Sequence, residues 1–296
     1  MKKWTASRAP AGRVAYVNGR YLPHSAAGVH IEDRALQLGD GIYEVAAISG
    51  GKMIDLEEHL DRLERSLGEI GMDMPMGRAA LKLVMREMMT RNRVRDGLLY
   101  LQVSRGAVRR DHPIPDMVPR PTLIMTVRPQ DPAIVKKKLT DGIGVISRPD
   151  ERWARRDIKT VQLLPNLLAK TEARKAGAYE AWFVDNDGFV TEGASTTAWI
   201  VDKDGHVVTR QLSHDVLPGV TRRVIIEAAA DGQLAIVERK FTVEEARGAR
   251  EAFLSSASGA AIPVVKIDGK AIGDGTPGPL TRRIQALYAQ KAGIET

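Results

Sequence analysis

The chain has 296 residues, of which 43% are hydrophobic and 27% are charged, and it carries a formal net charge of +7 with no cysteine. This length suits two domains or one large α/β domain, and the lack of cysteine excludes disulfides, thiolate nucleophiles and thiolate metal sites. No apolar run approaches the roughly 20 residues of a membrane span, and no apolar segment of the secretory kind follows Lys2 and Lys3, so we expect a cytoplasmic protein without membrane contact.

The positive charge by itself is compatible with nucleic-acid binding, because clustered lysines and arginines neutralise phosphates. The basic residues, however, form short groups scattered along the chain and mostly flanked by acids, and aromatic residues make up only 5%. No stacking motif or helix-turn-helix pattern accompanies them. We therefore expect no nucleic-acid partner, and a basic surface that attracts small anions is the favoured interpretation.

The N-terminal part of the chain alternates hairpins and helices. An Asn-Gly pair at 18–19 and a Gly-Gly pair at 50–51 each join two alternating apolar runs, which is typical of β-hairpins. Leucine and isoleucine recur at three- and four-residue intervals over 56–70, which predicts an amphipathic helix, and a second helix is expected at about 77–92. The strands GLLYLQVSRG and PTLIMTVRP follow.

The segment RPQDPAIVKKK has two prolines and a run of lysines, which is typical of a linker. We therefore predict a smaller α/β domain at 1–128, a linker at 129–134 and a larger domain at 135–296. The alternation of strands and helices predicts a mixed α/β (α+β) fold. The larger domain is expected to contain, in chain order, strand IGVISR, a helix from about Pro165, strands YEAWFVD, FVTEG and STTAWIV, helix PGVTRRVIIEAAA, strand AIPVVKIDG and helix PLTRRIQALYAQK.

Several motifs lead to no site. The segment GDGTPG at 273–278 has the glycine spacing of a dinucleotide-binding turn, but fewer than 20 residues follow it, too few for the second strand and its ribose-binding acid. The six histidines show no paired spacing, so no metal site is expected. Neither a phosphate-binding P-loop nor a G-x-S-x-G nucleophile elbow occurs.

A lysine precedes an apolar run in RRDIKTVQLLPNLLAK, residues 155–170. Lys159 is either an ordinary lysine with its stem packed and its ammonium in water, or a partly desolvated amine that attacks a carbonyl, as Schiff-base lysines do. Lys170, in the same segment, is interpreted as surface charge on the following helix. A pyridoxal phosphate site would in addition need an anion cradle and a carboxylate for the pyridinium nitrogen.

Two turns of small residues are candidates for that cradle. In DVLPGVTRRVIIEAAA a Pro-Gly turn opens a helix whose free N–H groups at 219–222 stabilise an anion, although an ordinary helix start is equally compatible. In FLSSASGAAIP, Ser256 and Ser258 are placed to complete such a cradle. Glu192, between FVT and a glycine, is either an exposed loop glutamate or the carboxylate of a covered site.

Six segments in order resemble the signature of the class IV aminotransferases, which are fold type IV pyridoxal phosphate enzymes. The resemblance spans nearly the whole chain, and within the family it is greatest to the D-amino acid aminotransferases. It implies their two-domain fold, with a substrate-carboxylate loop in the smaller N-terminal domain and the cofactor in the larger C-terminal domain. The segments are DRALQLGDGIYEV, EEHLDRLERS, DIKTVQLLPNLLAK, YEAWFVDNDGFVTEGAS, LPGVTR and PVVKIDGKAIGDG.

The resemblance implies a role for each matching position. Lys159 would be the catalytic residue, carrying pyridoxal 5'-phosphate as an internal aldimine and then moving the proton between substrate and cofactor. Glu192 would pair with the pyridinium nitrogen, and Arg62 would bind the phosphate; a surface arginine paired with Glu58 is the alternative for Arg62. The remaining cofactor-binding positions are Leu217 on the ring and, around the phosphate, Val220, Thr221, Ser256 and Ala257, the last where many members have threonine.

The D-amino acid aminotransferases hold the substrate carboxylate with a tyrosine, an arginine and a histidine. The matching positions here are Tyr43, Arg110 and His112, although the latter two, taken alone, are typical of a solvated basic loop. The resemblance implies that this loop reaches the neighbouring subunit's site, and hence a homodimer. Leu36 stands where the D-amino acid aminotransferases often have an aromatic residue, and Ala47 replaces a longer polar residue of some relatives, so the substrate breadth is open.

The expected activity is therefore a ping-pong transamination between D-amino acids such as D-alanine and 2-oxo acids, with 2-oxoglutarate converted to D-glutamate. Alternatives of the same fold are a branched-chain L-amino acid transaminase, an aminodeoxychorismate lyase and an R-amine transaminase. A basic nucleic-acid-binding protein with a degenerate enzyme fold is the alternative from a different class.

Overall fold

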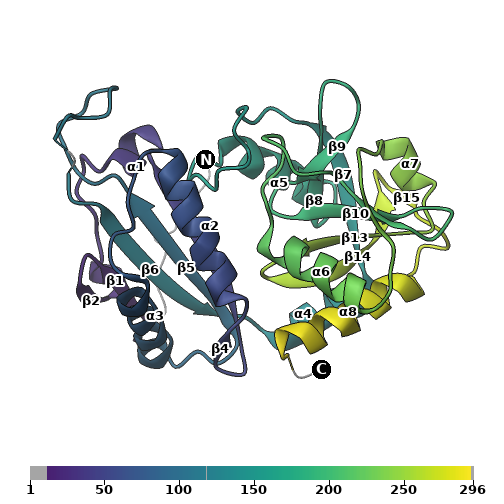
Figure 1. Ribbon diagram of the computed structural model, residues 1–296, viewed down its shortest axis with the longest axis horizontal. Coiled ribbons are helices and arrows are strands. Elements are labelled where there is room, and N and C mark those ends of the chain that lie inside the picture. Colours follow the sequence, from purple (N-terminus) through teal and green to yellow (C-terminus); the bar gives the residue numbers. More distant parts are fainter. Residues whose placement is uncertain (1–11, 118, 295–296) are drawn as a thin grey trace, which may run out of the picture. The chain divides into compact units, whose positions relative to one another are not determined.

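The computed structural model describes residues 12–117 and 119–294. The chain divides into two compact units, Met1–Pro129 and Gln130–Thr296 (Figure 1). Each unit is built on one β-sheet with helices packed against it, which confirms the expected mixed α/β class. Among the helices of the described residues, none is both long and apolar enough to cross a membrane.

Unit 1 is a six-stranded antiparallel sheet in the order β2-β1-β6-β5-β3-β4. Asn18 and Gly19, both with positive φ, form the turn of the first hairpin, as the Asn-Gly pair predicts. The elements of unit 1 are β1 (Val14–Val17), β2 (Arg20–Pro23), the short 3-10 helix η1 (His24–Ala26), α1 (Arg34–Leu38), β3 (Gly41–Ser49), β4 (Lys52–Met53), α2 (Leu56–Glu69), α3 (Arg78–Asn92), β5 (Gly97–Ser104) and β6 (Thr122–Pro129).

Helices α2 and α3 lie on one face of this sheet (Figure 1). Leu60, Leu63 and Leu67 of α2 are at most 2% exposed, which is the stripe that their spacing predicts. Along β3 the buried residues alternate with half-buried ones, because successive side chains of a strand point to opposite faces. Tyr43 and Ala47 therefore share the face of the sheet that is turned away from α2.

Helix α1 is not expected from the sequence. The Asp33 carboxylate accepts the N–H of Ala35 at 2.9 Å as its N-cap, and Gly39 ends it with a φ of +73°. The loop after β5 runs beside it, since the N–H of Arg34 donates to Gly106 O at 2.9 Å and Asp33 forms a β-bridge with Ala107. The start of the 105–121 loop is thus fastened to α1.

Unit 2 contains a nine-stranded mixed sheet in the order β12-β11-β10-β13-β14-β7-β8-β9, with β15 beside β14. The pairs β11/β12, β14/β7 and β7/β8 are parallel, and the other pairs are antiparallel. Its elements are α4 (Pro132–Asp141), β7 (Ile143–Pro149), α5 (Leu164–Lys175), β8 (Glu180–Val184), β9 (Val190–Gly193), β10 (Thr197–Val201), β11 (Val207–Thr209), α6 (Val220–Asp231), β12 (Ile236–Glu238), α7 (Val243–Arg247), β13 (Glu251–Ser256), β14 (Gly259–Ile267), β15 (Lys270–Ala271) and α8 (Pro279–Ala292).

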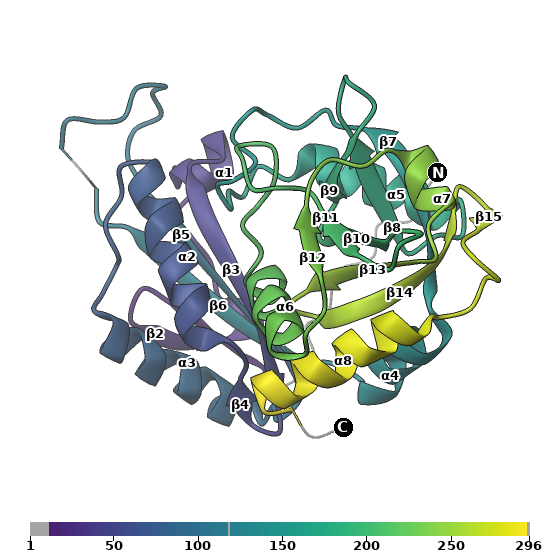
Figure 2. The same ribbon diagram turned by 45° about the vertical axis from the view of Figure 1, so that its right-hand side comes forward.

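Both faces of this sheet are covered. On one face the rings of Trp199 and Phe253 stack at 5.3 Å beneath α6 and α8, which lie side by side (Figure 2). On the other face Trp182 meets Phe241 edge-on at 6.2 Å. Strands that are buried on two faces read as continuous apolar runs, which explains EAWFV and TAWIV.

The expected linker at 129–134 is partly wrong. Residues from Pro132 onward belong to α4, because the Asp131 carboxylate caps the helix through the N–H of Ala133 and proline suits the first helical position. The prolines that indicate a linker in the sequence therefore mark a helix start.

The segment Gly273–Gly278 forms the turn between β15 and α8. The carboxylate of Glu251 accepts the N–H groups of Leu280 at 3.0 Å and Thr281 at 2.8 Å, so it occupies the N-terminus of α8. A Cβ on Gly278 would lie 2.0 Å from the Glu251 carboxyl carbon, which is why glycine stands there. The helix end that would bind a dinucleotide phosphate is filled by the protein's own carboxylate.

Candidate active site

Lys159 lies half-buried in the loop between β7 and α5. On both sides of Lys159 the chain is tied to residues 192–194, at the end of β9. Before the lysine, Arg152 forms an ion pair with Glu192, and after it Asn166 Nδ2 donates to Ala194 O at 2.7 Å. The two segments that carry the predicted lysine and glutamate are therefore neighbours.

Glu192 is buried at the end of β9, with 5% of its surface exposed. Its second carboxylate oxygen accepts the N–H of Leu217 at 3.2 Å, which brings in the LPGVTR segment. The N–H of Arg156 donates to His214 O at 2.9 Å, so the lysine loop also contacts the segment before Leu217. Hydrogen bonds thus join the three segments that the sequence singles out.

Glu192 is the last member of a chain of alternating ion pairs. Each arginine in it lies between two carboxylates, and the five contacts other than Arg152–Glu192 have N···O distances of 2.8 to 3.4 Å. Four carboxylates share three guanidiniums, so the fully ionised chain is one positive charge short. Its members, in order, are Asp185, Arg210, Asp215, Arg156, Asp150, Arg152 and Glu192.

The pKa of Glu192 is raised. Burial raises the pKa of the Glu192 carboxyl above that of an ordinary glutamate, although the Arg152 guanidinium and the Leu217 N–H act in the opposite direction. Arg152 also neutralises Asp150, whose own pKa is lowered because hydrogen bonds from Arg152 and Thr191 outweigh its burial. A cation that donates a hydrogen bond to Glu192 would supply the missing charge.

The predicted anion cradle gathers around the start of α6. A Cβ on Gly219, the N-cap residue, would lie 3.0 Å from Thr197 Oγ1, and Thr197 pairs with Ser255 between β10 and β13. Ser256 Oγ lies 3.1 Å from Ser258 Oγ in the turn that follows. Both cradle turns therefore converge on one place. Val220 and Thr221 are buried, whereas Leu217, Ser256 and Ala257 are half-buried.

Two further observations concern polar groups there. Within the described chain, α6 has no side-chain cap, so its first N–H groups are not satisfied in that way. Among the described residues, Thr196 Oγ1 is buried with no hydrogen-bond partner, and it lies 2.1 Å from where a Cβ of Gly193 would stand. Glycine at 193 therefore lets the Thr196 hydroxyl lie against the backbone of the residue that follows Glu192.

The interpretation of Lys170 as plain surface charge is wrong. Its ammonium donates to Tyr179 O at 2.9 Å, lies 3.2 Å from the fully buried carboxylate of Glu180 and stands over the Tyr179 ring. Glu180 in turn accepts the hydroxyl of Ser195 at 2.8 Å. An ammonium held by a carboxylate in this way serves as a structural cation.

Arg62, in unit 1, is half-buried, and only 9% of its side chain is exposed. Its Nε and Nη2 donate to the two carboxylate oxygens of Glu44 on β3 at 2.8 and 2.9 Å, and His59 Nδ1 lies 2.8 Å from the same carboxylate. Burial alone would raise the pKa of Glu44, but the Arg62 guanidinium and the His59 hydrogen bond outweigh it and hold that pKa far below its usual range. Arg62 is therefore not the surface arginine of the alternative interpretation.

Acid is expected to destabilise unit 1 by protonating Glu44 and so breaking its ion pair with Arg62. Because the pKa of Glu44 is lowered by folding, its stabilisation is complete above the unfolded glutamate pKa of about 4.3 and is lost as the pH falls below it. Thermal unfolding between pH 7 and pH 3 measures the loss. Glu44→Gln is expected to cost about 3–5 kcal/mol at pH 7 and to flatten the acid limb of the profile. An unchanged acid limb in that variant would contradict this assignment.

The three predicted carboxylate-binding residues all belong to unit 1. Tyr43 is half-buried and stacks on Tyr100 at 5.7 Å; burial, with Tyr43 as neighbour, raises the pKa of Tyr100 to about 12. Arg110 and His112 are exposed in the 105–121 loop. Strand β5 leads into this loop, and its Gln102 pairs with Tyr43 in the register of the sheet. The loop and the tyrosine therefore lie at the same end of the β3–β5 pair.

One group of described residues has the composition of a metal site, namely Asp202, Asp204 and His206 in the turn after β10. Asp202 Oδ1 accepts the N–H groups of Asp204 and His206 at 3.0 and 2.9 Å. The carboxylate thus closes its own turn, and the group is explained without a metal.

The family model for amino-transferase class IV matches residues 41–267, which include the lysine loop, Glu192 and both cradle turns. The chain belongs to the class IV aminotransferases. A D-alanine aminotransferase of Bacillus licheniformis is 38% identical over 279 residues, covering 94% of this chain and 97% of that protein. A D-alanine aminotransferase of Staphylococcus epidermidis is 38% identical over 270 residues, covering 91% and 94%.

Solved structures agree with this class IV aminotransferase fold. The branched-chain amino acid aminotransferase of Escherichia coli has a TM-score of 0.88 at 25% identity, with 96% of each chain covered. The branched-chain aminotransferase of the archaeon Thermoproteus uzoniensis, solved with norvaline, has a TM-score of 0.81 at 25% identity, again with 96% of each chain covered. The fold type IV resemblance expected from the sequence is confirmed.

Arg152 is the site residue that the sequence does not reveal. It belongs to a charged stretch, RPDERWARRD, whose residues give no sign of which turn inward. The available signal is its distance of seven residues from Lys159, on the same loop.

Proposed function

We propose that the protein is a pyridoxal phosphate-dependent transaminase that exchanges the amino group between D-amino acids, D-alanine in particular, and 2-oxo acids. The identity of 36–38% to D-alanine aminotransferases over more than nine-tenths of the chain supports the substrate class. The single observation that supports the chemistry is the ion-pair chain ending at Glu192, which is one positive charge short. A protonated pyridine nitrogen supplies that charge.

The residues around Glu192 fit the cofactor. The uncapped N-terminus of α6, with the N–H groups of Val220 and Thr221, suits a phosphate, and Ser256 and the N–H of Ala257 lie in the adjoining turn. We propose Arg62 as the cationic phosphate partner, although it already pairs with Glu44. Leu217 would pack on the ring, since its own N–H holds the glutamate. Unit 2 is thus proposed as the cofactor domain.

Pyridoxal phosphate, when bound, supplies an electron sink for charge that develops on the substrate α-carbon. The protein's own residues hold the cofactor and transfer the proton. Glu192 keeps the ring nitrogen protonated, and the Lys159 amine holds the cofactor and moves a proton from the substrate α-carbon. The half-buried position of Lys159 limits the water around that amine.

Substrate recognition is proposed to use Tyr43, Arg110 and His112, which together offer a phenol, a guanidinium fork and an imidazole to a planar carboxylate. We propose a homodimer in which Arg110 and His112 serve the partner's site. Two observations support it. The loop exposes apolar Ile114 and Met117, which are 56% and 87% exposed. In addition, α5 presents an exposed leucine stripe of the kind found in interfaces, made by Leu164, Leu167 and Leu168.

A cytoplasmic location is part of the same proposal. The chain has no cysteine, in keeping with a reducing compartment, and its proposed substrates are small amino and oxo acids.

The proposal is tested by supplying the purified holoenzyme with D-alanine or L-alanine and 2-oxoglutarate, and by measuring pyruvate and chirally resolved glutamate. We expect pyruvate and D-glutamate from the D isomer only. L-leucine is included because the structural likeness to branched-chain aminotransferases favours that second activity. Turnover confined to L substrates would show that the assignment is wrong, and gel filtration with light scattering measures the dimer.

A further inference from the structure

The loop of residues 105–121, between β5 and β6, carries Arg110 and His112 as exposed side chains, yet its backbone is held by a buried arginine. We propose that Arg34 is a positioning residue that fixes this loop so that Arg110 and His112 bind the substrate carboxylate. The inference rests on the proposed function and adds to it a residue that acts through the loop.

One guanidinium holds three successive carbonyls of the loop. Arg34 Nη1 donates to Asp111 O at 2.8 Å and to Pro113 O at 3.3 Å, and Nη2 donates to His112 O at 3.4 Å. These carbonyls directly follow Arg110 and include His112 itself. Because each peptide unit is planar, the three held carbonyls fix the backbone on both sides of His112 and directly after Arg110.

Arg34 is itself held in place. Its Nε donates to Asp40 Oδ2 at 2.7 Å, and its side chain is 5% exposed. Its backbone N–H donates to Gly106 O at 2.9 Å. The backbone of Arg34 therefore binds the start of the loop, and its side chain binds the middle. Burial alone would raise the pKa of Asp40, but hydrogen bonds from Arg105 and Arg34 outweigh it and lower that pKa. Asp40 therefore stays ionised near neutral pH and keeps its ion pair with Arg34.

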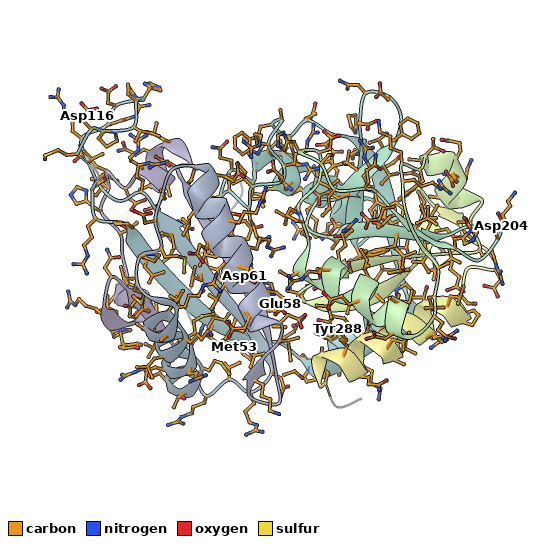
Figure 3. The ribbon with its side chains drawn as sticks, in the orientation of Figure 1. Met53, Glu58, Asp61, Asp116, Asp204 and Tyr288 are labelled. Atoms are coloured by element: carbon orange, nitrogen blue, oxygen red, sulfur yellow. The ribbon has the colours of Figure 1, made fainter. Side chains whose placement is uncertain are left out.

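The contacts of Arg34 matter because residues 109–114, 116 and 117 of the loop are exposed. In Figure 3 the labelled Asp116 marks the far end of the loop, which extends away from the sheet of unit 1. An unanchored exposed loop has to be ordered each time a ligand binds, and that cost weakens affinity. By fixing residues 111–113 in advance, Arg34 removes part of the cost for a carboxylate ligand.

The chain contains a matched control. Arg105 is also buried, at 2% exposure, and its Nε donates to the same Asp40 oxygen at 2.8 Å. Its Nη atoms, however, donate to Ile70 O at 2.7 Å and Gly71 O at 3.2 Å, which follow α2. Arg105→Gln therefore also removes one buried cation from Asp40, but it does not release the carbonyls of residues 111–113.

The test compares the Arg34→Gln and Arg105→Gln holoenzymes with the wild type. For Arg34→Gln we expect the KM for D-alanine and the inhibition constant of propionate, a carboxylate without an amine, to rise about tenfold, with kcat within about twofold. Arg105→Gln should leave both constants unchanged. Amide hydrogen exchange should become faster over residues 109–117 in Arg34→Gln alone. In an Arg110→Gln background, Arg34→Gln should add little, because both act on the same carboxylate.

Equal KM increases in the two variants, or unchanged exchange over 109–117 in an active Arg34→Gln enzyme, would overturn the inference. If Arg34→Gln gives no soluble holoenzyme, Arg34→Lys is measured in the same way, since a lysine keeps the charge beside Asp40 but cannot span three carbonyls. A wild type that is inert toward D-alanine would overturn the proposed function instead. In that case, faster exchange in Arg34→Gln would still show that Arg34 holds residues 111–113.

Discussion

Lys159→Ala is expected to abolish transamination and to lose the visible absorbance that borohydride removes from the wild-type holoenzyme. The amine has two duties, holding the cofactor and moving the α-proton, so the loss of kcat should reach or exceed the roughly 10²–10⁴-fold range of general acid–base catalysis. Steady-state turnover of D-alanine and the absorption spectrum measure the two effects. Methylamine added to the variant should restore part of the activity, since a free amine can carry the proton.

The second lysine of the same segment makes this result specific. Lys170 is held by Glu180 and Tyr179 O, so peptide mapping after borohydride reduction of the wild type should find the cofactor on Lys159 and not on Lys170. Lys175→Ala, at the exposed end of α5, is the matched control and should keep full activity and colour. A cofactor attached to Lys170, or an active and coloured Lys159→Ala, would refute the assignment.

Glu192→Gln is expected to lower kcat about 10²–10³-fold, the scale of losing a preorganised electrostatic partner. Glutamine is nearly isosteric, so the fold is retained while one negative charge is removed. The remaining three carboxylates then balance the three arginines of the ion-pair chain, and a cation beside residue 192 is no longer favoured. The cofactor nitrogen should lose its proton at a lower pH, which the pH dependence of the visible spectrum reports.

Glu251→Gln is the control for that change. Glu251 is also buried and also accepts backbone N–H groups, but it stands at the opposite end of β13 from Ser256. We expect a stability loss of about 1 kcal/mol, typical of a weakened helix cap, with kcat and spectrum unchanged. The role of Glu192 fails if both variants lose activity equally.

Lys159, Glu192 and Leu217 could be singled out from the sequence because each stands in a short motif whose members have a known order in the family. Their segments are neighbours in the structure, although the chemical roles of these residues remain proposals. Arg152 could not be singled out in this way. A charged stretch looks the same whether its arginines face water or carboxylates, and the choice here depends on Asp150 and Glu192, which come together only through the tertiary fold.

The overlooked helices show a second limit of sequence patterns. In α1 the five residues after Asp33 are too few to display a helical period, although the cap residue Asp33 and the terminal Gly39 are visible signals. In α4, Pro132 is easily taken for a residue that ends a helix, whereas proline is favoured in the first helical turn. Arg34 could not be predicted as a buried residue either, because it is covered by the 105–121 loop, which is distant in the sequence.

The alternating ion pairs that end at Glu192 also have an evolutionary consequence. Asp185, at the far end, is linked to Glu192 only through five intermediate partners, yet replacing it would change the charge balance of the whole set. We therefore expect positions 150, 156, 185, 210 and 215 to covary among homologues. An acid lost at one of them should be accompanied by an arginine lost at another, which a comparison of homologous sequences would test.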